Sequence, residues 1–161
     1  MNLRPLSLIA GLLLLAACSS NPSTNANTGG GASSAPSTSS SVTPGSAQDF
    51  IQNVGDRVFF DYDKSSVKSE GQQTLQRQAD WLKKYPNVTV TLEGHADERG
   101  TREFNLALGE RRANSVRNAL VALGIPAARL KTISYGKERP AVLGSNEAAW
   151  AQNRRGVTVI N

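Results

Sequence analysis

Residues 93–123, EGHADERGTREFNLALGERRANSVRNALVAL, decide how the chain folds. The alternating apolar run 88–92 precedes them and predicts a strand, and the charged turn 94–100 leads from this strand into a helix of about five turns. At about 100° per residue, five apolar side chains of this helix fall in one sector. They predict a stripe that faces the core: Leu106, Ala113, Val116, Leu120 and Leu123.

Three further residues of the helix, Asn105, Leu108 and Arg112, share a narrower sector at the edge of this stripe. The carboxylate of Asp97 in the turn and the guanidinium of Arg112 are therefore predicted to face one cleft. The alternative is a structural salt bridge between the turn and the helix, because such pairs are common and contribute little when exposed. The residues alone leave both interpretations open.

Further elements are predicted on both sides of this unit. The helix before it is expected to bury Leu75, Ala79 and Leu82, with Trp81 and Tyr85 widening the apolar face. The predicted elements are strands at 57–62, 88–93, 130–135 and 156–160, a helix at about 67–85 after N-cap residues at 63–66, and a short helix at 147–153.

The order βαβαβ(α)β predicts an α+β fold, with a single mixed four-stranded sheet and the two main helices on one face. Right-handed crossovers would make the first three strands largely parallel if they pair as neighbours. The strand order itself stays open at this point.

The N-terminus reads as an export signal. Residues 1–17 contain one basic residue, Arg4, and an apolar core at 6–15. A helix that spans a bilayer needs about 20 apolar residues, so this segment is predicted to be a signal peptide that is cleaved. The alternative is a short buried helix, but nothing amphipathic follows it.

The sequence Leu15-Ala16-Ala17-Cys18 resembles the lipobox of bacterial lipoproteins. The resemblance implies that Cys18 is lipidated and becomes the mature N-terminus, and that Ser19 after it favours transfer to the outer membrane. Several acyl chains on one residue would hold the protein stably at a membrane. Because Cys18 is the only cysteine, the chain forms no intramolecular disulfide, and a free thiol is the alternative.

Residues 19–47 contain no charge and no hydrophobic periodicity, and ten of these 29 residues are Ser. Such a segment buries too little apolar surface to offset the entropy of ordering. Residues 18–47 are therefore predicted to be the lipidated N-terminus and a flexible linker. The remainder, 48–161, is long enough for one domain with its own core.

Charge and chemistry exclude several classes of function. The net charge is +5, but basic and acidic residues are interleaved, so an exported chain of this kind is not expected to bind nucleic acid. With one Cys and one His, His95, we expect no enzyme, no metal and no cofactor. Arg154 and Arg155 read either as an anion patch or as a pair that caps a helix end.

Three separated blocks of the chain match one pattern in order: FFDYDKSSV from Phe59, GHADERGTREFNLALGERRANSV from Gly94, and SYGKERPAVLGSNEAAWAQNRRGVTV from Ser134. They resemble the OmpA-like peptidoglycan-binding family over residues 59–159. The resemblance implies that the chain binds the meso-diaminopimelate of the peptidoglycan stem peptide. It places the ligand contacts on Asp97, Asn105, Leu108 and Arg112, joined across the cleft by Tyr62 and Asp63.

The chemistry of these residues agrees with that ligand. The free end of meso-diaminopimelate carries an ammonium and a carboxylate on one carbon. Arg112 can hold the carboxylate with paired, charge-assisted hydrogen bonds, and Asp97 can accept from the ammonium. A lysine stem has the amine without the carboxylate, so it would leave Arg112 unpaired.

The resemblance also implies partners and a place. It suggests a non-enzymatic linker between the outer membrane and the cell wall, on the periplasmic side and anchored by lipid at Cys18. It suggests membership of the Tol system, which acts in envelope integrity and in outer-membrane constriction at cell division. A TolB-like periplasmic propeller protein would then bind a surface that overlaps the peptidoglycan site.

The lipobox generates a direct test. Cys18→Ser should abolish lipidation, because serine cannot accept the thioether-linked diacylglycerol, and should leave the protein uncleaved or soluble. Fractionation of cells expressing this variant checks the result. If the variant still sediments with outer membranes in high salt, the lipobox interpretation is wrong.

Overall fold

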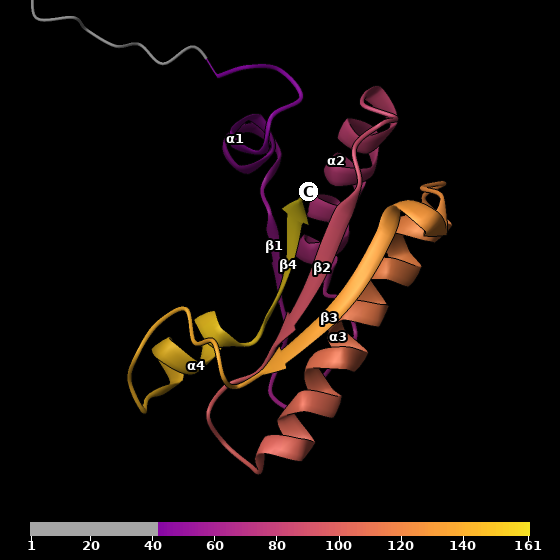
Figure 1. Cartoon of the computed structure of the whole chain (residues 1–161). Helices are drawn as coiled ribbons and strands as arrows, with labels where there is room; N and C mark the ends of the chain where they lie inside the picture. Colours follow the sequence, from indigo (N-terminus) through magenta and orange to yellow (C-terminus); the bar gives the residue numbers. More distant parts are fainter. Residues whose placement is uncertain (1–41) are drawn as a thin grey trace, which may run out of the picture. The chain divides into compact units, whose positions relative to one another are not determined.

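A four-stranded mixed sheet carries two long helices on one face in the computed structural model, which describes residues 42–161 (Figure 1). The predicted α+β fold class is confirmed. The predicted signal peptide, Cys18 and most of the predicted linker lie outside the described residues. Among the residues described, no helix is long and apolar enough to cross a membrane.

The elements follow one another in the order that the sequence predicts. Three short helical segments are added, two before the first strand and one before the third. They are α1 (Ala47–Asp49), η1 (Phe50–Val54), β1 (Arg57–Phe59), α2 (Ser69–Lys84), β2 (Val90–His95), α3 (Arg102–Ala122), η2 (Ala127–Arg129), β3 (Leu130–Gly136), α4 (Glu147–Asn153) and β4 (Arg155–Ile160).

The helical segment before β1 was not anticipated, because α1 and η1 are too short to show a periodic pattern. Ser46 caps α1 by accepting from the backbone N–H of Asp49 at 3.1 Å. The Asp49 carboxylate accepts from the indole N–H of Trp81 at 2.9 Å, and the Phe50 ring lies edge-on to Trp81 with centroids 4.9 Å apart. These contacts fasten the segment to α2.

The predicted N-cap of α2 at 63–66 is wrong, because the helix begins only at Ser69. Lys68 occupies the cap position in an extended conformation and makes no side-chain cap hydrogen bond. Its ammonium instead donates to Asp61 at 2.9 Å. The residues between β1 and α2 therefore form a longer loop, which contributes to the site described below.

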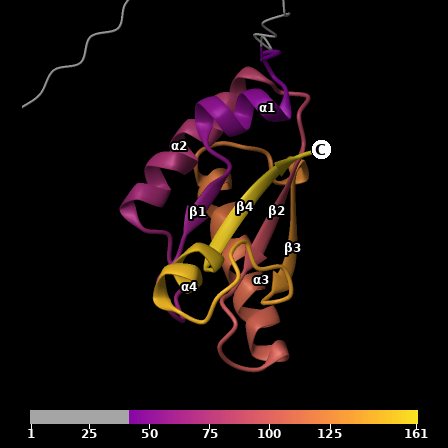
Figure 2. The same cartoon turned by 90° about the vertical axis from the view of Figure 1, so that its left-hand side faces the viewer.

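The strand order is β1-β4-β2-β3, with β4 antiparallel to both β1 and β2, and β3 parallel to β2 (Figure 2). The strand order, which the sequence left open, separates β1 from β2 by β4, and β1, β2 and β3 run in the same direction. The three residues of β1 offer few ladder hydrogen bonds, whereas β4 has six residues and pairs on both sides. The last strand of the chain is thus inserted between the first and the second.

The core lies between the sheet and the two long helices. On α2 the predicted face is confirmed, since Leu75, Ala79 and Leu82 are fully buried. On α3 the predicted stripe holds for Ala113, Val116 and Leu120 but is wrong for Leu106, which is 48% exposed. Leu106 lies beside Ser134 on the edge strand β3, where the sheet ends and no further strand covers it.

Helix α3 contacts strand β2 through backbone atoms. A Cβ placed on Gly94 would lie 1.7 Å from the carbonyl oxygen of Gly109, and one placed on Gly109 would lie 2.3 Å from the hydroxyl of Ser134. That hydroxyl donates to the Leu106 carbonyl at 2.6 Å. The two glycines therefore allow α3 to lie directly on the sheet, and this fixes the helix relative to the loop that follows β2.

We expect Gly94→Ala to lower the free energy of unfolding by about 3 kcal/mol or more, because the added methyl group must push two backbone segments apart. Gly71→Ala is the matched control. There the nearest atom is a side-chain methyl of Val67, and alanine favours helix. Urea unfolding of both variants measures the effect, and equal stabilities would contradict the packing described.

Candidate functional site

The side chain of Arg112 lies at the centre of the predicted site and is fully buried. Its guanidinium donates to three backbone carbonyls, those of Lys64 at 2.8 Å, His95 at 2.7 Å and Asp61 at 3.0 Å. These carbonyls belong to the loop after β1 and to the end of β2. One side chain on α3 thus holds both segments that border the site.

Arg112 keeps its positive charge despite this burial. Removal from water lowers the pKa of its guanidinium to about 10, and the nearby carboxylate of Asp97 opposes the change. Guanidinium has five N–H donors, and the three carbonyls leave two of them unassigned. Within residues 42–161 Arg112 forms no ion pair closer than 4 Å, so the alternative of a direct salt bridge with Asp97 is not what the structure contains.

Asp97 follows β2 and is 4% exposed. Its carboxylate accepts from Arg99 through Nη2 at 2.6 Å, through Nε at 3.2 Å and through the backbone N–H at 3.2 Å. It also accepts from Arg154 Nη1 at 3.4 Å. Burial by itself raises the pKa of Asp97, but the hydrogen bonds from Arg99 outweigh it and the pKa lies below its ordinary value.

Arg99 covers Asp97 on the solvent side. The guanidinium carbon lies 4.0 Å from the centroid of the Tyr62 ring and 4.1 Å from that of the Trp150 ring. Tyr62 comes from the loop after β1 and Trp150 from α4, so the three side chains join three distant parts of the chain. Tyr62 itself is exposed.

The remaining predicted residues surround this cluster. Asn105 is buried, and its amide donates to the carbonyls of Arg99 at 2.8 Å and Thr101 at 3.1 Å, which fixes the turn. Leu108 is buried on α3 one turn before Arg112. Asp63 is exposed in the loop after β1, where it has a positive φ of 53°, and its charge helps to hold Arg112 protonated. The six predicted residues thus gather at one end of the sheet.

The sequence did not assign Arg99, Trp150 or Arg154 to this site. Arg154 is neither a surface anion patch nor a simple helix cap: its Nη2 pairs with Glu147 at 2.5 Å and its Nε donates to the Phe60 carbonyl at 3.1 Å. Arg155, also buried, donates to the Arg139 carbonyl at 3.2 Å. Arg99 stands two residues after Asp97 in the same turn, whereas Trp150 and Arg154 carry no local pattern that links them to Asp97, because they reach this end only through the strand order.

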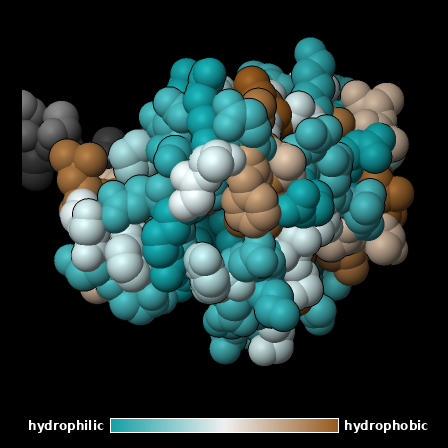
Figure 3. All heavy atoms as spheres, turned by 90° about the horizontal axis from the view of Figure 1, so that it is seen from below, coloured by the Kyte–Doolittle hydropathy of each residue, from teal (hydrophilic) through white to brown (hydrophobic). Residues whose placement is uncertain are grey.

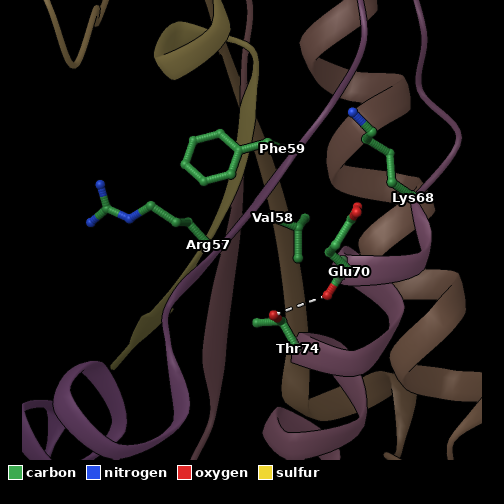
Figure 4. A pocket seen from close by; sticks show the side chains of 7 residues that line it. Arg57, Val58, Phe59, Lys68, Glu70 and Thr74 are labelled. Atoms are coloured by element: carbon green, nitrogen blue, oxygen red, sulfur yellow. Dashed lines mark hydrogen bonds between the residues drawn. The ribbon is translucent and has the colours of Figure 1, made fainter.

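The end of the domain that carries α4 and the start of α3 has a mostly hydrophilic surface, with apolar side chains in small separate patches (Figure 3). Three cavities are of note, and one of them, of about 220 Å³, lies beside the start of α3 between Arg102, Leu106 and Tyr135. One of about 390 Å³ lies at the open edge of β1 against the first turn of α2, and its charges, on Arg57, Lys68 and Glu70, are of both signs (Figure 4). One of about 240 Å³ lies between the turn after β2 and the loop before α4. None of the six predicted ligand residues lines these cavities, and the carboxylate of Asp97 is covered by Arg99.

His95 falls within the predicted turn 94–100, but it is the last residue of β2 and is buried. Its Nε2 lies 3.3 Å from the Glu93 carboxylate. Burial, together with the charges of Arg155 and Arg139, lowers the pKa of His95 to about 4. In the described part of the chain, no group of three or more His, Cys, Asp or Glu could hold a metal ion.

The buried imidazole predicts a dependence of stability on pH. His95 takes up a proton more readily in the unfolded chain, where its pKa is about 6.5, so acidification favours unfolding. We expect the free energy of unfolding to fall by on the order of 2 kcal/mol between pH 6.5 and pH 4.5. Asp97 contributes only below its ordinary pKa of 3.8.

His95→Gln should remove most of this slope, which urea unfolding at several pH values measures. Equal slopes for both proteins would contradict the assignment to His95.

Comparison with known proteins agrees with this fold. Residues 59–154 match the OmpA family. A peptidoglycan-associated lipoprotein of Agrobacterium fabrum is 62% identical over 120 residues, which cover 74% of this chain and 68% of the relative. One of Rhizobium meliloti is 54% identical over 151 residues, which cover 92% and 82%. The crystal structure of the peptidoglycan-associated lipoprotein from Burkholderia pseudomallei matches with a TM-score of 0.64 at 47% identity, over 66% of this chain and 90% of that chain. The chain therefore belongs to the OmpA family, and within it to the peptidoglycan-associated lipoproteins.

Proposed function

We propose that this protein is an outer-membrane lipoprotein that binds peptidoglycan non-covalently through the meso-diaminopimelate of the stem peptide. The observation that carries the proposal is the juxtaposition of a carboxylate and a guanidinium of opposite charge, Asp97 and Arg112, at one end of the sheet. Both lie in the block that matches the OmpA family. The names of the relatives, peptidoglycan-associated lipoproteins, agree with the proposal.

The two charges suit the zwitterionic end of meso-diaminopimelate. Asp97 accepts from the ligand ammonium, and the two unassigned N–H groups of Arg112 donate to its carboxylate. Tyr62 and Asp63 border the ligand on the side of the loop after β1. Asn105 and Leu108 act behind it, where the amide of Asn105 holds the turn that carries Asp97.

The two backbone segments that border the site are held in place before the ligand arrives. Arg112 already holds the loop after β1 and the end of β2 through three carbonyls, so ordering these segments costs little on binding. The proposed function is binding without a catalytic step. This agrees with a chain that has a single histidine, which is buried beside a carboxylate. The rival function, a cell-wall hydrolase, finds no support in this arrangement.

The proposal extends to the rest of the chain by resemblance. A lipid at Cys18 would anchor the protein on the periplasmic face of the outer membrane, and residues 19–47 would let the domain reach the cell wall. We propose that it acts in the Tol–Pal system, in envelope integrity and in outer-membrane constriction at cell division. A TolB-like propeller protein is the periplasmic partner we expect.

Sedimentation of the full chain with purified sacculi tests the site. Asp97→Asn should weaken binding by at least about thirtyfold, because a neutral amide leaves the ligand ammonium without a counter-charge in a buried place. Free stem peptide that contains meso-diaminopimelate should release the unaltered protein.

The matched control is Asp80→Asn, which changes an exposed carboxylate on α2. Thermal unfolding of the same samples separates lost binding from lost folding, since Asp97 also pairs with two arginines. Folded Asp97→Asn protein that binds sacculi fully would overturn the proposed site, and so would equal affinity for sacculi with lysine stems.

A further inference from the structure

The carboxylate of Asp97 is already occupied in the free protein. It receives three N–H groups of Arg99 and one of Arg154, and a carboxylate has about four lone-pair positions. It is 4% exposed. A ligand cation therefore reaches Asp97 only if one of these arginine side chains leaves.

Arg99 is the side chain that can leave. Its side chain is 30% exposed, and apart from Asp97 it is held only by the faces of the Tyr62 and Trp150 rings. Arg154 is 7% exposed and has two further partners, Glu147 and the Phe60 carbonyl. Arg112 is held by three carbonyls. Moving Arg154 or Arg112 would leave buried polar groups unpaired, whereas Arg99 moves into water.

The charges in this cluster indicate which charged groups the ligand must carry. Three guanidinium groups, on Arg99, Arg112 and Arg154, are matched by three carboxylates, on Asp97, Glu147 and Asp63, so the charges of these six groups balance before a ligand arrives. A ligand that brings only an ammonium displaces Arg99 from Asp97 and leaves this guanidinium without an anionic partner. A ligand that also brings a carboxylate supplies the missing anion.

We propose that Arg99 is the internal counter-ion of the site and determines its specificity by exchange. On binding, the ligand ammonium replaces the guanidinium of Arg99 at Asp97, and the released guanidinium pairs with the ligand carboxylate. The aromatic faces of Tyr62 and Trp150 keep Arg99 within reach of the ligand. One internal ion pair becomes two intermolecular ones, which only a zwitterion can complete. The inference rests on the proposed function and adds the residue that rejects a plain lysine side chain.

The test compares two tripeptides, L-Ala-γ-D-Glu-meso-diaminopimelate and L-Ala-γ-D-Glu-L-Lys, by calorimetry on the full chain in detergent. For the unaltered protein we expect clear preference for the first peptide. In Arg99→Gln, the lysine peptide no longer has to displace a cation, and the diaminopimelate peptide has lost one charge-assisted partner. The ratio of the two affinities should therefore fall by about tenfold or more.

Arg102→Gln is the matched control, because Arg102 is an exposed arginine three residues further along that pairs only with Glu138. It should leave the ratio unchanged. A second measurement follows the unaltered protein itself. In the unaltered protein, the NMR signal of the Arg99 Nε–H, assigned by its absence in Arg99→Gln, should shift when the diaminopimelate peptide is added, because its bond to Asp97 is broken.

The outcomes separate the two proposals. Failure of the unaltered protein to bind either peptide would overturn the proposed function, and the exchange with it. Binding with preference for diaminopimelate, together with an undiminished ratio in Arg99→Gln or an unshifted Arg99 signal, would overturn the exchange alone. Loss of the ratio in Arg102→Gln as well would show a general effect of surface charge and would also count against Arg99.

Discussion

The buried guanidinium of Arg112 is the interaction on which the site depends. A charge without exposure to water is costly unless its hydrogen bonds are made, and here three backbone carbonyls supply them. The same bonds satisfy carbonyls of the loop after β1 and of the end of β2, which an apolar side chain would leave unpaired. Arg112 is therefore a structural residue first, and its remaining N–H groups are oriented by bonds that do not involve a ligand.

Close backbone packing makes this geometry available. Because Gly94 and Gly109 let α3 lie directly on β2, the side chain of Arg112 can reach the carbonyl of His95, the last residue of β2. The insertion of β4 between β1 and β2 then brings Arg154 and the adjoining helix α4 to the same end. The charged cluster is thus assembled from the ends of the central strands and from the loops that follow them, on a rigid sheet.

The ion pairs of this cluster differ in what holds them. Arg154 and Arg112 each bond to backbone carbonyls and lie away from water, so their positions are set by the fold. Arg99 depends on one carboxylate and two ring faces at the surface. The arginines of this cluster keep the buried carboxylate of Asp97 ionised in the absence of ligand. In the exchange we propose, the side chain that moves is Arg99, which has the fewest contacts to lose.

The sequence by itself determined the main helices and strands, the α+β class, and the placement of Asp97, Asn105 and Arg112 together, because helical and strand periodicities act locally. The sequence did not reveal the close contact between α3 and β2 that requires glycine at positions 94 and 109. The tertiary structure alone decided the insertion of β4, the exposure of Leu106 and the pairing of Arg154 with Asp97. These features depend on which strands become neighbours and where the sheet ends, and residues 57 positions apart in sequence carry no local pattern that reports it.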